Sequence, residues 1–234
     1  MGLLSTMHLM GRKTPLKLYG PKGLMEIITL QLKYSDTVLN YDITFTEIDT
    51  ETHQCIHEDP QVEVYTIPLD HRIPCSGFLF KEKPKKFRIV KDNLPENLEI
   101  SKIQALKNGQ DVLNENGEIE LDHRFYTKPP RKSFSYAYCS DTKYNESIIP
   151  IIQGSDMLYH ESTFLDEHMD RASNTYHSTA REAATIAKKA NVGQLLLGHF
   201  SVRYKALEPL QEEARSVFEN AHIAEEGKEF ILHD

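Results

Sequence analysis

Four strand-like runs in this chain lead into a histidine or an aspartate. They read VEVYTIPLDH, SFSYAYCSD, SDMLYH and QLLLGH, and they reach His71, Asp141, His160 and His199. Strands that lie side by side bring their ends to the edge of a sheet, so we expect these side chains to gather there. Imidazole and carboxylate groups at one edge are the groups that a metal-assisted hydrolase needs.

Three of these residues also have a simpler structural interpretation. Asp141, in the string CSDT, offers two oxygens that could bridge two cations, but it could equally cap the turn that follows. His199 follows the apolar run QLLLG and could be a buried histidine with satisfied hydrogen bonds, while His71 could be an ordinary loop residue. Residue type alone leaves both interpretations open.

A second polar group consists of His160, Glu161 and His177. His160 and Glu161 end one strand, and His177 precedes the helical string STAREAA. A glutamate that orients a histidine can make that histidine a proton donor to a leaving oxygen. The alternative is that these side chains cap or brace neighbouring elements.

The elements that must position these residues follow an α/β pattern. Helical spacing over 24–35 places one apolar face on Leu24, Ile27, Ile28 and Leu32. From residue 133 strands and helices alternate, and Ser178 is the expected N-cap of the helix in STAREAATIAKKA. This alternation predicts a layered α/β domain.

Residues 81–132 interrupt the pattern, and we expect them to form an inserted arm on a domain that otherwise spans 1–234. Turn signals at Asn108-Gly109 and Asn116-Gly117 predict a pair of small hairpins. Basic residues concentrate at the two ends of the segment: Lys81, Lys83, Lys85, Lys86, Arg88 and Lys91, then Lys128, Arg131 and Lys132.

Composition narrows the class of protein. A length of 234 residues fits one domain with an insertion, and no apolar run reaches the roughly 20 residues of a membrane span, so no membrane association is expected. The three cysteines are odd in number and lack a CxxC pair, which favours a cytoplasmic protein and disfavours a thiolate zinc site. The net charge of −8 disfavours nonspecific nucleic-acid binding by the whole surface, although a local basic patch remains possible.

Six strings, taken in order, resemble a known family. LYGPKGL, LDHRIPCSGF, YCSDT, LYHEST, YHSTAREAA and GHFSVRY follow one another as in ribonuclease Z, the tRNA 3′-end endonucleases of the metallo-β-lactamase superfamily. HEST stands where that family has His-Glu-Ala-Thr, and HST at 177–179 is unchanged. The resemblance runs over nearly the whole chain and implies the αββα sandwich of the superfamily.

The resemblance implies roles for individual residues. It gives three metal ligands: His71, Asp141 and His199. Asp141 is then the carboxylate that bridges two zinc ions, and Glu161 with His177 is the pair that protonates the leaving ribose oxygen, with His160 in support. Precursor tRNA is the implied substrate and a homodimer the implied assembly.

The chain departs from the family in two places. The hallmark His-x-His-x-Asp-His, which supplies further metal ligands, is absent from the sequence. We therefore expect an N-terminally truncated fold with an incomplete zinc ligand set, and a chain that is inactive alone. The arm region also lacks the Gly-Pro turn of the family, which predicts a shorter or reshaped arm.

The leading hypothesis is a zinc-dependent endoribonuclease that removes the 3′ trailer of precursor tRNA by phosphodiester hydrolysis. One alternative is a catalytically incompetent fragment that keeps only a dimerisation or tRNA-binding surface. The other is a different phosphodiesterase of the same superfamily.

Overall fold

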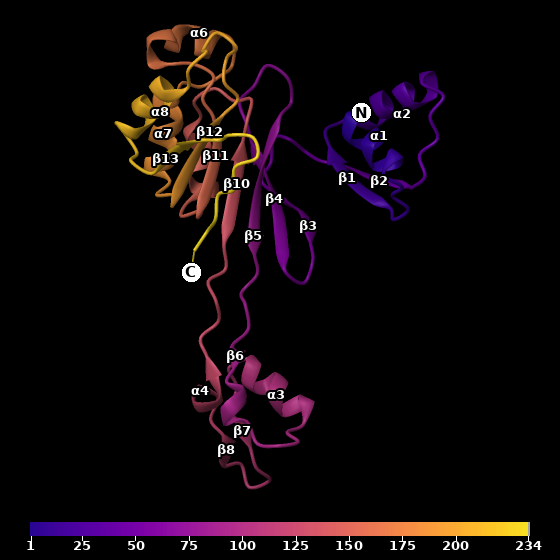
Figure 1. Ribbon diagram of the computed structural model, residues 1–234, viewed down its shortest axis with the longest axis vertical. Helices are drawn as coiled ribbons and strands as arrows, with labels where there is room; N and C mark the ends of the chain where they lie inside the picture. Colours follow the sequence, from indigo (N-terminus) through magenta and orange to yellow (C-terminus); the bar gives the residue numbers. More distant parts are fainter. Residues whose placement is uncertain (234) are drawn as a thin grey trace.

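The computed structural model describes residues 1–233 and is built around one seven-stranded mixed sheet (Figure 1). The strand order is β13-β12-β11-β10-β5-β4-β3. The strands are β3 (Cys55–Glu58), β4 (Val62–Pro68), β5 (Ser76–Glu82), β10 (Ser135–Cys139), β11 (Met157–Glu161), β12 (Gln194–Gly198) and β13 (Ala221–Ile223). Strands β10 to β13 are parallel to one another, whereas β3, β4, β5 and β10 pair antiparallel in succession.

This topology brings four strand ends to one edge. Strands β10, β11 and β12 are parallel, and β4 lies two antiparallel steps from β10, so β4 also runs in their direction. The segments that follow these four strands therefore leave the sheet at the same edge. His71, Asp141 and His199 lie on three of these segments.

Helices α7 (Ala180–Lys189) and α8 (Glu208–Arg215) pack against each other and against the parallel half of the sheet (Figure 1). The buried face of α7 is rich in alanine, which lets the helix approach the strands closely: Ala180, Ala183, Ala184 and Ala187. The core between helices and sheet also includes Leu158, Ile186, Leu195, Leu197 and Leu210.

The N-cap of α7 is Thr179, so the expectation of Ser178 was wrong by one residue. The Thr179 hydroxyl accepts a hydrogen bond from the Glu182 backbone N–H, and the Glu182 carboxylate accepts one from the Thr179 N–H. A capping box requires the glutamate three residues after the cap, and only Thr179 satisfies that spacing. The Ser178 hydroxyl instead donates to the backbone carbonyl of Thr142 at 2.7 Å.

Short helical turns connect the remaining strands: η2 (Glu146–Ile148), α5 (Ile149–Ile152), η3 (Asp166–His168) and α6 (Met169–Asn174). Gly154 follows α5 with φ +68, as expected of a helix-ending glycine. Among residues 1–233, no helix is both long and apolar enough to cross a lipid bilayer.

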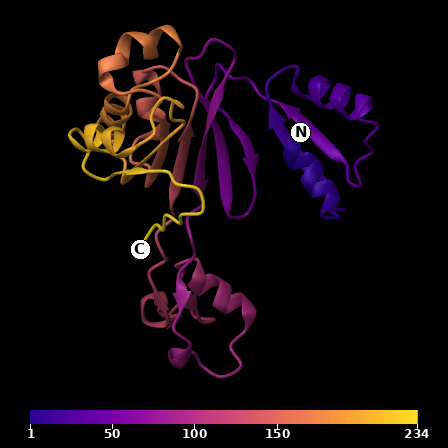
Figure 2. The same ribbon diagram turned by 45° about the horizontal axis from the view of Figure 1, so that its top comes forward.

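The first 48 residues form a small unit beside the main sheet (Figure 2). It comprises α1 (Gly2–Leu9), β1 (Leu16–Gly20), α2 (Leu24–Tyr34) and β2 (Ile43–Glu47), with β1 and β2 paired in parallel. Ile28 is buried, but Ile27 is 56% exposed, so the apolar face predicted for α2 was too broad. A two-stranded sheet covers only a narrow stripe of a helix, which explains the difference.

The segment between β5 and β10 projects away from the sheet as a separate body (Figures 1 and 2). It contains β6 (Arg88–Ile89), η1 (Lys91–Asn93), α3 (Ile100–Lys107), β7 (Val112–Leu113), β8 (Ile119–Leu121), α4 (His123–Tyr126) and β9 (Thr127–Lys128). Its small core consists of Leu106, Val112 and Leu121. Of the two predicted hairpins, the one around Asn116-Gly117 forms, whereas Asn108-Gly109 ends helix α3 because 100–107 is helical.

Candidate metal centre

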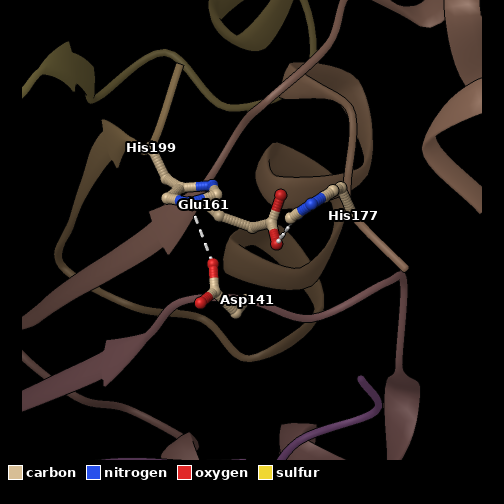
Figure 3. A group of neighbouring side chains, drawn as sticks. All are labelled: Asp141, Glu161, His177 and His199. Atoms are coloured by element: carbon tan, nitrogen blue, oxygen red, sulfur yellow. Dashed lines mark hydrogen bonds and ion pairs between the residues drawn. The ribbon is translucent and has the colours of Figure 1, made fainter. Parts of the chain in front are cut away.

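Asp141 and His199 face each other at the shared strand edge (Figure 3). Asp141 follows β10, His199 follows β12, and the His199 Nε2 atom lies 2.9 Å from Asp141 Oδ1. Both residues have left-handed backbones, with φ of 61° and 56°. Non-glycine residues adopt this conformation rarely, and the conformations that cost backbone energy cluster at functional sites.

The Asp141 carboxylate has the properties of a ligand to a cation. Its Oδ1 atom is buried and, among the described residues, accepts no hydrogen bond. Most buried polar atoms have a hydrogen-bond partner, so a buried carboxylate oxygen 2.9 Å from an imidazole nitrogen, with no hydrogen bond between them, suits a bound cation. A metal ion bound between Asp141 and His199 would do so.

His71 lies beside His177 in the same site. Its Nδ1–H donates to the backbone carbonyl of Tyr176 at 3.1 Å, which leaves the Nε2 lone pair free for a metal. Tyr176 is itself left-handed, with φ 59°. The His71 ring centroid is 5.5 Å from that of His177, which is 5.2 Å from that of His199, so the His177 ring lies close to both of the other rings.

The structure brings four of the predicted residues into one tight group: Asp141, Glu161, His177 and His199 (Figure 3). Each offers one ligand atom, and these atoms all lie within 4.8 Å of one another. His71 stands outside this group, beside His177.

The Glu161 carboxylate is fully buried and accepts four hydrogen bonds. Oε1 accepts from the Thr142 backbone N–H at 2.7 Å and from His177 Nδ1 at 3.0 Å. Oε2 accepts from the Thr163 hydroxyl at 2.6 Å and from the Ser178 N–H at 2.9 Å. With four donors the carboxylate has no lone pair left for a metal, so within the group it positions His177 instead of binding a cation.

These hydrogen bonds set opposite pKa shifts on Glu161 and His177. Burial raises the pKa of Glu161, but the hydrogen bonds from His177, Thr163 and Ser178 outweigh it and the net pKa is lowered. The hydrogen bond to Glu161 raises the pKa of His177 above its usual range, against the effect of burial. The pair therefore favours an ionised glutamate next to a histidine that holds its proton.

Comparison of the sequence with known proteins identifies the family of this chain. No family model matches the chain. A ribonuclease Z of Cytophaga hutchinsonii is 53% identical over 233 residues, covering 100% of this chain and 74% of that protein. The chain belongs to the ribonuclease Z family. The Parabacteroides distasonis ribonuclease Z is 43% identical over 227 residues, covering 97% of this chain and 74% of that protein.

Solved structures confirm the fold expected for a ribonuclease Z family member. The short form of human tRNase Z has a TM-score of 0.60 at 23% identity, and the alignment covers 96% of this chain and 70% of that one. The metallo-β-lactamase fold protein YhfI from Bacillus subtilis has a TM-score of 0.59 at 18% identity, with 97% and 69% covered. The α/β class and the metallo-β-lactamase fold are therefore both confirmed.

Within this ribonuclease Z family site, His160 stands apart from the tight group. It is 1% exposed, and its Nδ1–H donates to the backbone carbonyl of Glu161 at 2.8 Å. Its Nε2 atom is buried and has no hydrogen-bond partner among residues 1–233. Burial lowers the pKa of His160, so the neutral ring is favoured.

Three residues that hold the site together were not predicted from the sequence. Thr142 and Thr163 both contact Glu161, and Tyr176 accepts from His71. The signal for Thr163 was present, since it stands two residues after Glu161 in HEST. The roles of Thr142 and Tyr176 come from backbone groups, which a residue type does not reveal.

A second group of ligand-type side chains lies in the projecting segment: Asp111, Asp122 and His123. Asp111 Oδ1 accepts from both the N–H and the Nδ1 of His123, and Asp122 caps α4 by accepting from the Arg124 N–H. The carboxylate Oδ1 atoms of Asp111 and Asp122 are therefore occupied by hydrogen bonds that join the β7–β8 hairpin to α4. The group stabilises the projecting segment.

Proposed function

We propose that this chain provides the metal-binding and proton-donating residues of a zinc-dependent endoribonuclease that removes the 3′ trailer of precursor tRNA. The observation that supports this most directly is the pair formed by the buried Glu161 and the partly exposed His177, beside the Asp141–His199 pair. One pair suits proton donation and the other suits metal binding. Membership of the ribonuclease Z family supports the choice of substrate.

In this mechanism His71, Asp141 and His199 would hold the metal. Zinc ions, when bound, would supply an activated water and offset negative charge on the phosphate. Glu161 orients His177 through the bond to Nδ1, and the raised pKa keeps a proton on the ring. As the bond between phosphorus and the ribose oxygen breaks, His177 donates its proton to that oxygen.

The test is cleavage of a precursor tRNA by this chain, and by the same chain extended at its N-terminus to the length of its relatives. We expect cleavage that requires zinc and is lost with a chelator. Asp141→Ala in the active form should abolish turnover, since it removes the oxygen that faces His199. Near-normal turnover of that variant, or cleavage that a chelator does not affect, would refute the proposal.

The second candidate is a catalytically incompetent fragment that keeps a dimerisation or tRNA-binding surface. The absence of a His-x-His-x-Asp-His string from the sequence favours it. Zinc titration by calorimetry separates the two, because the fragment hypothesis expects no binding at micromolar zinc. A different phosphodiesterase of the superfamily would cleave a small bis-aryl phosphodiester but leave precursor tRNA intact.

We further propose that the protein works as a cytoplasmic homodimer. Helix α2 exposes Ile27, Leu30 and Tyr34, with exposed fractions of 56%, 54% and 80%. Apolar side chains gathered on one exposed helix are typical of an interaction surface. Sedimentation equilibrium tests the assembly, and a monomer at micromolar concentration would exclude it.

A further inference from the structure

Thr163 connects the two halves of the site. Its hydroxyl lies 2.6 Å from Glu161 Oε2, 2.9 Å from His199 Nδ1 and 2.8 Å from the His199 carbonyl oxygen. The side chain is 6% exposed, so water does not compete freely for these contacts. Through this one hydroxyl, the Glu161–His177 pair contacts the ring that faces Asp141.

The hydroxyl has only one proton to distribute among three neighbours. Glu161 Oε2 and the His199 carbonyl can only accept, so the proton goes to one of them, and Glu161 is the nearer and the charged one. The contact with His199 Nδ1 is then favourable only if the ring nitrogen donates to the hydroxyl oxygen. A lone pair on Nδ1 would otherwise face a lone pair on Oγ1.

A proton on Nδ1 of His199 also determines the state of the other ring nitrogen, Nε2. A neutral His199 with its proton on Nδ1 carries a bare lone pair on Nε2. Nε2 lies 2.9 Å from Asp141 Oδ1, but no hydrogen bond joins the two atoms, and Oδ1 accepts none from any other described residue. Two electron-pair donors then lie 2.9 Å apart with no proton between them, an arrangement that a bound cation would stabilise.

We propose that Thr163 is a positioning residue that sets the tautomer of His199 so that Nε2 is free to bind metal, while it joins that ring to Glu161. The reaction that this role of Thr163 would serve is the one given by the proposed function. It does not depend on which metal binds, nor on the identity of the RNA.

The first test reads the ring nitrogens of His199 directly. In the metal-free ¹⁵N-labelled chain, long-range proton–nitrogen correlation spectra above pH 8 should show His199 with its proton on Nδ1. Thr163→Val, which keeps the shape and removes the hydroxyl, should move the proton to Nε2 or give a mixture. Thr163→Ser should restore the Nδ1–H form. Thr127→Val, which removes the hydroxyl of a buried threonine in the projecting segment that donates to the His123 carbonyl, should leave it unchanged.

The second test is cobalt or zinc titration of the same chains by calorimetry. Removing a partner that orients a metal-ligating histidine weakens metal binding by about 10–100-fold, so this is the loss expected for Thr163→Val. Thr163→Ser should bind within about threefold of the unaltered chain, well below the loss expected for Thr163→Val.

An Nε2–H tautomer in the unaltered chain overturns the proposal, even if Thr163→Val does not fold. So does a Thr163→Val variant that keeps the native tautomer and the native affinity. If this chain shows the expected tautomer shift while the N-terminally extended chain cleaves no precursor tRNA with zinc present, the proposed function fails and the role of Thr163 stands.

Discussion

Glu161 shows at the scale of one residue how a buried charge is tolerated. A carboxylate without partners in an apolar interior would take up a proton. Here two backbone N–H groups, one hydroxyl and one imidazole donate to it, and its pKa falls below the usual range despite burial. The same four bonds fix the loops that carry Thr142, Thr163 and His177.

We predict that Glu161→Gln destabilises the fold by roughly 2–4 kcal/mol, the range for leaving buried donors unsatisfied. The amide –NH₂ must occupy the position of Oε1 or of Oε2, and in either place it meets a backbone N–H, of Thr142 or of Ser178, that then lacks an acceptor. The free energy of unfolding from urea titration measures this. Glu167→Gln, at an exposed position, is the control, and equal stability of the two variants would contradict the prediction.

At the scale of elements, strand direction and backbone conformation place the ligands. The parallel ends of β10 and β12 point the chain toward one edge, and the left-handed residues Asp141 and His199 then turn the side chains toward each other. The β11 strand between them carries Glu161 at its end. Three neighbouring strands thus supply the metal-binding pair and the carboxylate that braces it.

The opposite edge of the sheet has its own carboxylate. Asp156 precedes β11, accepts from the N–H and the hydroxyl of Ser135 at 2.7 and 3.1 Å, and pairs with Lys132. These contacts tie the returning strand of the projecting segment to the sheet. Burial raises the pKa of Asp156, but the Lys132 and Ser135 contacts outweigh it and the net pKa is lowered.

Because the pKa of Asp156 is lower in the folded protein than in the unfolded chain, its contribution to stability falls as the pH falls. The ionised carboxylate stabilises the fold above its unfolded pKa of about 3.9, and that stability is lost as the pH falls through the folded value. We predict that Asp156→Asn costs about 1–3 kcal/mol at pH 7 and progressively less below about pH 4. Urea titrations across pH measure it, with Asp36→Asn at an exposed position as control. A cost that stays constant down to pH 2 would refute the assignment.

Sequence patterns predicted the strands and helices better than the caps and hydrogen bonds that connect them. The strands around Ala137, Leu158 and Leu196 follow from short apolar runs with turn signals on either side. The N-cap of α7 was misplaced by one residue, although the three-residue spacing from Thr179 to Glu182 was already readable in the sequence. The bonds of His71 with Tyr176 and of Glu161 with Thr142 use backbone atoms, which composition and spacing do not encode.

At the scale of the whole molecule, the candidate site and the projecting segment lie at opposite ends of the sheet (Figure 1). The segment leaves after β5 and returns before β10, while the site lies beyond the other end of β10. Ser135 to Asp141 alone spans about 20 Å at the usual rise of a strand. A substrate that touches both regions must be long, which fits a folded RNA.

Charge is divided within the projecting segment. Residues 81–91 and 128–132, here named the stalk, carry nine basic residues and one acidic residue, Glu82. Residues 92–127, here named the head, carry three basic residues (Lys102, Lys107 and Arg124) and eight acidic ones. Phosphates are attracted to the stalk and repelled by the head, so the proposed RNA-binding surface belongs on the stalk.

We predict that Lys86→Ala with Arg131→Ala weakens binding of precursor tRNA and lowers the slope of log affinity against log salt by about 0.7–0.9 for each phosphate that the protein no longer neutralises. Both side chains are exposed and, within residues 1–233, form no ion pair, so they are available for phosphates. Filter binding or fluorescence anisotropy between about 50 and 300 mM salt measures the slope, since the screening length near the middle of this range is about 10 Å or less. The matched control is Lys107→Ala with Arg124→Ala in the head, which removes the same charge and should leave the slope unchanged, because the surrounding carboxylates keep RNA away. A slope that falls with the head variant and stays with the stalk variant would reverse the assignment and place the RNA on the head.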